Sequence, residues 1–156
     1  CGQNNAIAQS EIHRSYYAYT VAIDLDRIGI DGALEISQEE KAERVKVFLD
    51  AVHYLYRDIK GRRENFSPLF IIGGRYNRKN PFFENRVRVE KNKINVSTLR
   101  EVLEEDKDIE NNTVVGVMTN IFDNDQEIRE ELNATTVGKV FDHLKEEVEK
   151  YYGESN

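Results

Sequence analysis

Residues 37–61 carry the pattern that most constrains the fold, because they read as one long amphipathic helix. Ser37 and Glu40 have the spacing of a capping box, in which two side chains satisfy backbone N–H groups at a helix start. Gly61 follows the last apolar residue, as is typical of a helix end. Such a helix must bury its apolar stripe against another layer. The stripe comprises Ala42, Val45, Phe48, Leu49, Val52, Leu55, Tyr56 and Ile59.

Four other stretches have the composition of strands. Residues 16–28 alternate between an apolar and a polar face, and residues 86–90 alternate charged and apolar side chains. Residues 69–74 (LFIIGG) and 113–119 (TVVGVMT) are short apolar runs bounded by turn residues. The Gly73-Gly74 pair closes the first of these runs, where it makes a turn or admits a close backbone approach.

Two further helices complete the order of elements. One runs from Thr98, which forms a second capping box with Glu101, to about Glu105, and the other begins near Thr135. The order strand, helix, strand, strand, helix, strand, helix predicts an α+β fold of the RRM or ferredoxin-like type. We expect an antiparallel sheet of about four strands packed against two or three helices, complete in itself or part of a larger sheet.

The length of the chain limits the number of domains that it can form. The chain has 156 residues, of which 39% are hydrophobic, so it suits one domain with a core. We expect a polar amino-terminal segment over residues 1–15 and a single domain over residues 16–153. No apolar run approaches the roughly 20 residues of a membrane span. Cys1 is the only cysteine, which rules out an internal disulfide and favours the cytoplasm. Because the chain begins with Cys, we expect a fragment of a longer protein.

The positive charge of the chain is concentrated between Arg57 and Lys93. This segment holds eleven Lys and Arg residues against four Asp and Glu residues, a net charge of +7, whereas the whole chain carries −7. Everything outside the segment therefore sums to −14. Such asymmetry indicates an anionic partner at one face.

Aromatic residues accompany these cations, as single-stranded nucleic acid binding requires: cations contact phosphates and rings stack on bases. The candidate rings are Tyr16, Tyr76, Phe82 and Phe83. A solvated pair of basic strands that balances acidic helices explains the same composition, and composition by itself leaves both interpretations open.

Residues suited to catalysis are sparse. His13, His53 and His143 belong to separate predicted elements and lack the spacing of metal ligands. Asp24 and Asp26 share a strand face and could act together on a metal or a proton, although solvation explains them as well. No glycine-rich nucleotide-binding motif follows a strand. We therefore expect no enzymatic activity, no catalytic residue, no metal and no cofactor.

Two blocks of the chain carry a family resemblance: GQNNAIAQSEIHRSYYAYTVAIDLDRIGID (residues 2–31) and RDIKGRRENFSPLFIIGGRYNRKNPFFEN (residues 57–85). They resemble the carboxy-terminal portion of DevR-type CRISPR-associated proteins, which are RAMP-superfamily backbone subunits of type I (I-B-like) Cascade. The likeness covers most of residues 2–90. It implies an RRM-like subunit in prokaryotic antiviral defence that grips CRISPR RNA without reading its sequence, while base pairing recognises the target.

The resemblance also implies partners and site residues. The partners are CRISPR RNA, other Cascade subunits and copies of the same chain, and no catalytic role is implied. On the matching blocks, we expect RNA binding by Gln3, Asn4, His13, Arg14, Arg62, Arg63, Arg75, Arg78 and Lys79.

Two other functions remain open at this point. The basic segment could dock on an acidic protein surface and drive self-assembly, or the chain could be a ferredoxin-like RNA-processing endonuclease that depends on His13 or His53. The RNA-binding hypothesis has its own condition: the basic residues must be available to phosphate and not locked in pairs with the carboxylates of the protein.

Overall fold

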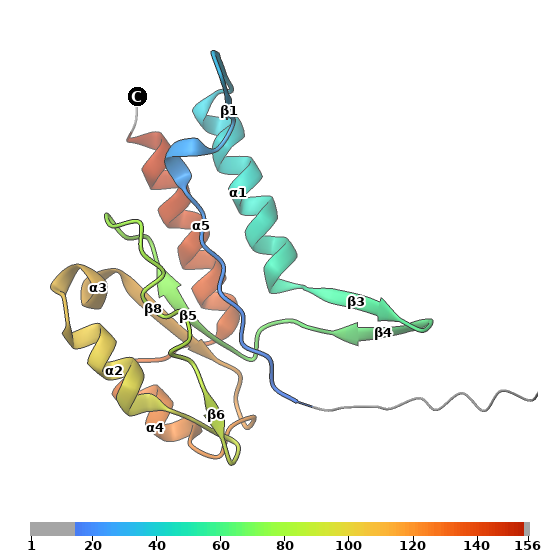
Figure 1. The fold of residues 1–156 in the computed structure, drawn as a ribbon, viewed down its shortest axis with the longest axis vertical. Coiled ribbons are helices and arrows are strands. Elements are labelled where there is room, and N and C mark those ends of the chain that lie inside the picture. The colour runs from blue at the N-terminus through green and yellow to red at the C-terminus, as the bar shows by residue number, and fades with distance from the viewer. Residues whose placement is uncertain (1–14, 155–156) are drawn as a thin grey trace, which may run out of the picture.

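The computed structural model describes residues 15–154, which form five α-helices, a short 3-10 helix and eight short strands (Figure 1). Every strand pair is antiparallel. No helix in this part of the chain has the length and apolar character of a membrane span. The elements are η1 Leu25–Arg27, β1 Ile30–Asp31, β2 Leu34–Glu35, α1 Gln38–His53, β3 Tyr56–Ile59, β4 Arg62–Asn65, β5 Phe70–Gly74, β6 Val89–Glu90, β7 Lys93–Ile94, α2 Val96–Glu104, α3 Lys107–Asn112, β8 Thr113–Val117, α4 Asp125–Glu131 and α5 Val137–Gly153.

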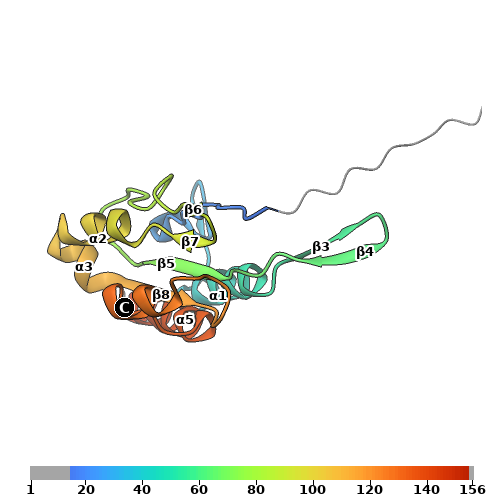
Figure 2. The same cartoon turned by 90° about the horizontal axis from the view of Figure 1, so that it is seen from below.

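The β5–β8 pair lies at the centre of the molecule. Its register runs from Phe70 opposite Val117 to Gly74 opposite Thr113. Because side chains alternate across a strand, Phe70 and Val117 point into a core shared with α2 and α4. The other face receives α5, so helices cover the pair on both sides (Figure 2). This core contains Ile94, Val96, Leu99, Val115, Val117, Phe122, Ile128 and Leu132.

A second cluster joins the two longest helices. Ala42 and Val45 of α1 pack against Val148 and Tyr152 of α5. Ser37 caps α1 by accepting a hydrogen bond from the backbone N–H of Glu40, at 3.2 Å. The predicted capping residue thus starts the helix, and burial of Ala42 and Val45 on α5 stabilises it. Phe48, which belongs to the predicted stripe, remains exposed.

The predicted α+β class is confirmed, and the structure is consistent with a mixed ferredoxin-like fold. The predicted strands at 69–74 and 113–119 appear as β5 and β8, and the last helix begins at Val137 with Thr136 as its cap. The strands are distributed over two-stranded sheets, however, and do not form one sheet of about four strands.

The strand predicted over residues 16–28 is wrong. Residues 15–24 form no strand, and η1 follows them. Only the end of the alternating face is packed: Ile23 and Leu25, with the neighbouring Ile28, lie against the α1–α5 cluster, whereas Tyr17, Tyr19 and Val21 are exposed. Packing of apolar side chains satisfies the pattern, whereas a strand also needs a hydrogen-bonded neighbour.

The helix predicted over residues 37–61 is too long. It ends at His53, and the chain then turns into the β3–β4 hairpin. Lys60 and Gly61 have φ values of 50° and 77°, as a two-residue hairpin turn with two left-handed positions requires. Gly61 therefore makes a hairpin turn and does not end a helix.

The boundaries of two other predicted elements, the second helix and the strand at residues 86–90, also differ in the structure. The second helix begins at Val96, so Thr98 lies inside it and is not its cap. The strand predicted over residues 86–90 is reduced to β6, which turns through two left-handed residues into β7.

Candidate nucleic-acid interface

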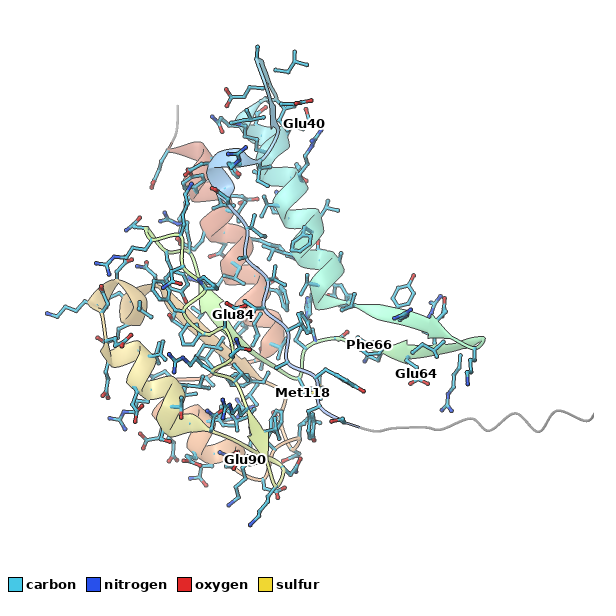
Figure 3. The ribbon with its side chains drawn as sticks, in the orientation of Figure 1. Glu40, Glu64, Phe66, Glu84, Glu90 and Met118 are labelled. Atoms are coloured by element: carbon cyan, nitrogen blue, oxygen red, sulfur yellow. The ribbon has the colours of Figure 1, made fainter. Side chains whose placement is uncertain are left out.

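The β3–β4 hairpin, residues 56–65, projects from the body of the protein as a basic arm (Figures 1 and 2). At its base, the backbone N–H of Phe66 donates to the carbonyl of Leu55, at 2.8 Å. Glu64 lies farther out on β4 than Phe66 (Figure 3). Every residue of the arm except the half-buried Glu64 is exposed. The arm carries four cations and two acids, so its net charge is +2.

The two predicted arginines of the arm lie on opposite faces of the hairpin. Arg63 stands opposite Asp58 in the register, and its Nε lies 3.3 Å from an Asp58 carboxylate oxygen. Arg62 lies 3.5 Å from Glu64 on the other face. The side chains of Arg63 and Arg62 remain 66% and 83% exposed, respectively. Exposed ion pairs of this kind are screened by water and contribute little, so both guanidinium groups stay accessible to phosphate.

One aromatic ring stands beside these cations. Tyr56 of β3 lies under Arg63, whose guanidinium carbon is 4.2 Å from the ring centroid. Tyr54, at the end of α1, is also exposed. Sequence reasoning missed both rings as binding candidates because it assigned them to the predicted helix. A two-residue turn at Lys60-Gly61, flanked by β-favouring residues, was the signal that could have revealed the hairpin.

Three of the four rings predicted to stack on bases, Tyr76, Phe82 and Phe83, are half-buried and pack within the fold, whereas Tyr16 remains 45% exposed. Tyr76 is half-buried and its hydroxyl lies 2.8 Å from the Thr113 hydroxyl oxygen, while burial raises the pKa of Tyr76 to about 12. Phe82 meets Tyr76 edge to face at 5.1 Å between centroids. Phe83 packs against the central core. Tyr16 donates a hydrogen bond to Asn92, and its ring lies 5.5 Å from that of Phe122.

The three predicted cations after β5 are tied to other elements of the protein. Arg75 pairs with Glu147 of α5 at 3.3 Å, and its guanidinium carbon lies 5.9 Å from the Tyr151 ring centroid. Arg78 pairs with Asp106, at the start of α3, at 2.9 Å. The third cation, Lys79, is held by two carboxylates, one just before η1 and one within it.

Lys79 lies between Asp24 and Asp26, 2.9 Å and 2.7 Å from their carboxylate oxygens. Its hydrogen bonds to Asp26 and Asp24 raise the pKa of Lys79. Two hydrogen bonds lower the pKa of Asp26. The one from Lys79 has the larger effect, and the one from the Tyr151 hydroxyl has the smaller. All five predicted cations within residues 15–154 therefore pair with carboxylates of the protein, so they are not free of such pairs as the RNA-binding hypothesis required. Arg62 and Arg63 pair within the arm, whereas Arg75, Arg78 and Lys79 connect the 75–79 loop to other elements; only Arg75 among the five is also largely shielded from solvent.

Four predicted residues, Gln3, Asn4, His13 and Arg14, lie outside the described residues. His53 stacks on Tyr54 at 4.2 Å and on Phe141 at 4.5 Å between ring centroids, so its ring takes part in packing. Within residues 15–154, no group of three or more His, Cys, Asp or Glu residues is placed to hold a metal ion.

Comparison with known proteins gives a family. The model of the family described as CRISPR-associated negative auto-regulator DevR/Csa2 matches residues 2–98, which is more than half of the chain and includes the whole basic arm. No curated protein and no solved structure matches the chain significantly. The family match agrees with the resemblance carried by the two sequence blocks. The chain belongs to the DevR/Csa2 family of CRISPR-associated proteins.

Proposed function

We propose that this chain is a non-catalytic RNA-binding subunit of a type I Cascade effector, in which it holds CRISPR RNA through the phosphate backbone. The observation that carries the proposal is the basic arm, where the exposed Arg62 and Arg63 stand together with the exposed Tyr56 on a hairpin that projects from the body. Membership of a CRISPR-associated family supports the identity of the nucleic acid.

The chemistry of the arm suits single-stranded RNA of any sequence. Guanidinium groups bind phosphate oxygens through several donors at once. Tyrosine rings stack on bases whatever their identity, because every base has a π-face. The arm can thus bind RNA without reading its sequence, through the side chains of Arg62, Arg63 and Tyr56. Such binding is expected when a guide RNA recognises its target by base pairing.

The wider assembly follows from the same proposal. Other Cascade subunits and further copies of this chain are its partners, residues 16–153 act as one domain, and the setting is the cytoplasm. The packing of His53 between two aromatic rings supports a binding role over catalysis. Hydrolysis of repeat RNA that disappears in His53→Ala would instead favour a nuclease.

The test is RNA binding by an Arg62→Glu/Arg63→Glu variant of the full chain. We expect poly(U) affinity to fall, and the slope of log K against log salt to flatten by about 0.7 for each phosphate that is no longer neutralised. A matched control is Arg44→Glu/Arg100→Glu. It changes the net charge equally at two exposed arginines that also pair with carboxylates, but on α1 and α2. Equal affinity in the arm variant and the parent would refute the proposal.

A second candidate, self-assembly through the basic arm, is favoured by an acidic surface on the helices α2 and α4. Four glutamates and one arginine line one groove there, and the arginine, Arg100, pairs with two of the glutamates; the acids are Glu101, Glu104, Glu127 and Glu131. The arm of a neighbouring copy offers the opposite charge, and electrostatic complementarity directs such contacts. Salt-sensitive self-association without RNA that disappears in Arg62→Glu/Arg63→Glu would support this candidate.

A further inference from the structure

The cations at Arg78 and Lys79 are not simply exposed: each is held by carboxylates from elements distant in the sequence. Lys79 contacts Asp24 and Asp26, and Arg78 contacts Asp106, all at 2.7–2.9 Å. These are the distances of charge-assisted hydrogen bonds to an anion. Around Lys79, two carboxylates supply the negative oxygens that a phosphate group would offer.

The carboxylates are fixed more firmly than the cations. Asp24 accepts a hydrogen bond from the backbone N–H of Asp26 at 3.2 Å, which caps η1. Asp26 also accepts a hydrogen bond from the Tyr151 hydroxyl. Asp106 caps α3 by accepting from the N–H of Asp108 at 2.8 Å. Each acid therefore keeps its place through interactions that do not involve the basic residue.

The two cations, in contrast, can move away from these carboxylates. The side chains of Arg78 and Lys79 are 69% and 64% exposed, and each sits on a long, rotatable stem. Exposed ion pairs contribute little net stability, so another anion can replace the carboxylates at small cost. Arg75 is different, because its pair with Glu147 is only 33% and 18% exposed and is shared with Lys150. We assign Arg75 to the fold.

We propose that Asp24, Asp26 and Asp106 are built-in counter-anions, which occupy Lys79 and Arg78 when no RNA is bound and compete with RNA phosphate for them. This inference rests on the proposed RNA-binding function. It adds a regulating element to that function: the acids lower the affinity for RNA and make its salt dependence shallower than the number of cations would suggest.

The experiment measures poly(U) binding by the full chain in an Asp24→Asn/Asp26→Asn variant. Asparagine keeps the size of each side chain and is an equally good helix-capping residue. We expect affinity to rise by about two- to fivefold, the range that competition from exposed ion pairs allows. The slope of log K against log salt should steepen by about 0.7 for one additional phosphate that Lys79 neutralises.

Lys79→Ala makes the test specific. Combined with Asp24→Asn/Asp26→Asn, it should abolish the gain in affinity, and in the parent background it should lower affinity by less than that gain, because the two acids already occupy Lys79 for part of the time. Asp106→Asn should produce a similar gain through Arg78. The control for net charge is Glu40→Gln/Glu104→Gln, which removes two acids from pairs with Arg44 and Arg100 and should give a smaller gain.

The outcomes separate this inference from the proposed function. A parent that binds RNA through the arm, together with Asn variants whose affinity is unchanged or lower, refutes the counter-anions and leaves the function intact. A gain that survives Lys79→Ala also refutes them, as does unfolding of both the Asp24→Asn/Asp26→Asn and Asp106→Asn variants, since the acids would then be structural. Absence of RNA binding in the parent refutes the function itself.

Discussion

The guanidinium carbon of Arg63 lies 4.2 Å from the centroid of the Tyr56 ring, on the facing strand of the β3–β4 hairpin. The same guanidinium group lies beside the Asp58 carboxylate, directly opposite in the register. A cation over a tyrosine face is attracted by the ring quadrupole, and this attraction holds both side chains in place on an otherwise exposed arm. The arm thus presents an ordered cation and an ordered ring together.

Replacement of Tyr56 tests the role of this ring. Tyr56→Ala should weaken poly(U) binding by about 1–3 kcal/mol, the typical contribution of one base stacked on an aromatic side chain. Tyr56→Phe keeps the π-face and should retain most of the affinity. Fluorescence anisotropy with a labelled oligoribonucleotide measures both variants. If Tyr56→Ala and Tyr56→Phe bind equally well, the ring does not stack on RNA.

The neighbouring glycines of β5 provide a matched pair for stability. A Cβ at Gly74 would lie 1.7 Å from the carbonyl oxygen of Asn112, whereas a Cβ at Gly73 would meet no atom within 4 Å. Gly74→Ala should therefore lower the free energy of unfolding by about 1–3 kcal/mol or more, because backbone has to move. Gly73→Ala should change it little. Urea denaturation gives both values, and equal losses would contradict the close approach.

Glu147 connects α5 to the loop after β5, and its contribution should depend on pH. The pKa of Glu147 is lowered from 4.5, mainly by the hydrogen bond from Lys150 and to a smaller extent by the one from Arg75. Burial of the carboxylate acts in the opposite direction and raises the pKa. The folded state therefore favours the charged form. Its stabilisation is fully present above pH 4.5 and is lost as the pH falls through the lowered folded pKa.

A Glu147→Gln variant checks this sign. At neutral pH, it should lose about 1 kcal/mol of unfolding free energy, because the two ion pairs are partly exposed. As the pH falls well below 4.5, the parent and the variant should converge. Urea denaturation over a pH series measures the difference. A gap that widens on acidification would show that the pairs with Arg75 and Lys150 do not stabilise the fold.

The buried side chain of Asn124, just before α4, connects to the backbone of Ile94 at the end of β7. Its Oδ1 accepts from the backbone N–H of Ile94 at 3.0 Å, and its Nδ2 donates to the Ile94 carbonyl at 2.8 Å. Asn124→Ala leaves both buried backbone groups without this partner and should cost about 1–3 kcal/mol of unfolding free energy. Asn111→Ala, at an exposed position of α3, is the control. Similar losses in both would refute the assignment.

Local sequence patterns predicted the elements that local forces specify. Ser37 starts α1, the apolar runs at 69–74 and 113–119 become β5 and β8, and Thr136 starts α5 one residue from the predicted position. Capping, apolar periodicity and turn residues act over a few residues, so a single chain shows them directly. The family resemblance, carried by two sequence blocks, likewise needed no structure.

Tertiary structure decided how those residues are used. Residues 16–24 have a strand pattern but form no strand, because pairing requires a second backbone at the right place. Tyr54 and Tyr56 fit a helical stripe as well as a hairpin, and periodicity cannot separate the two over so short a stretch. The pairing of Lys79 with Asp24 joins residues 55 positions apart, and that of Arg75 with Glu147 joins residues 72 apart. Sequence gives the charge of these side chains, whereas the folded chain sets the distances over which the charges act.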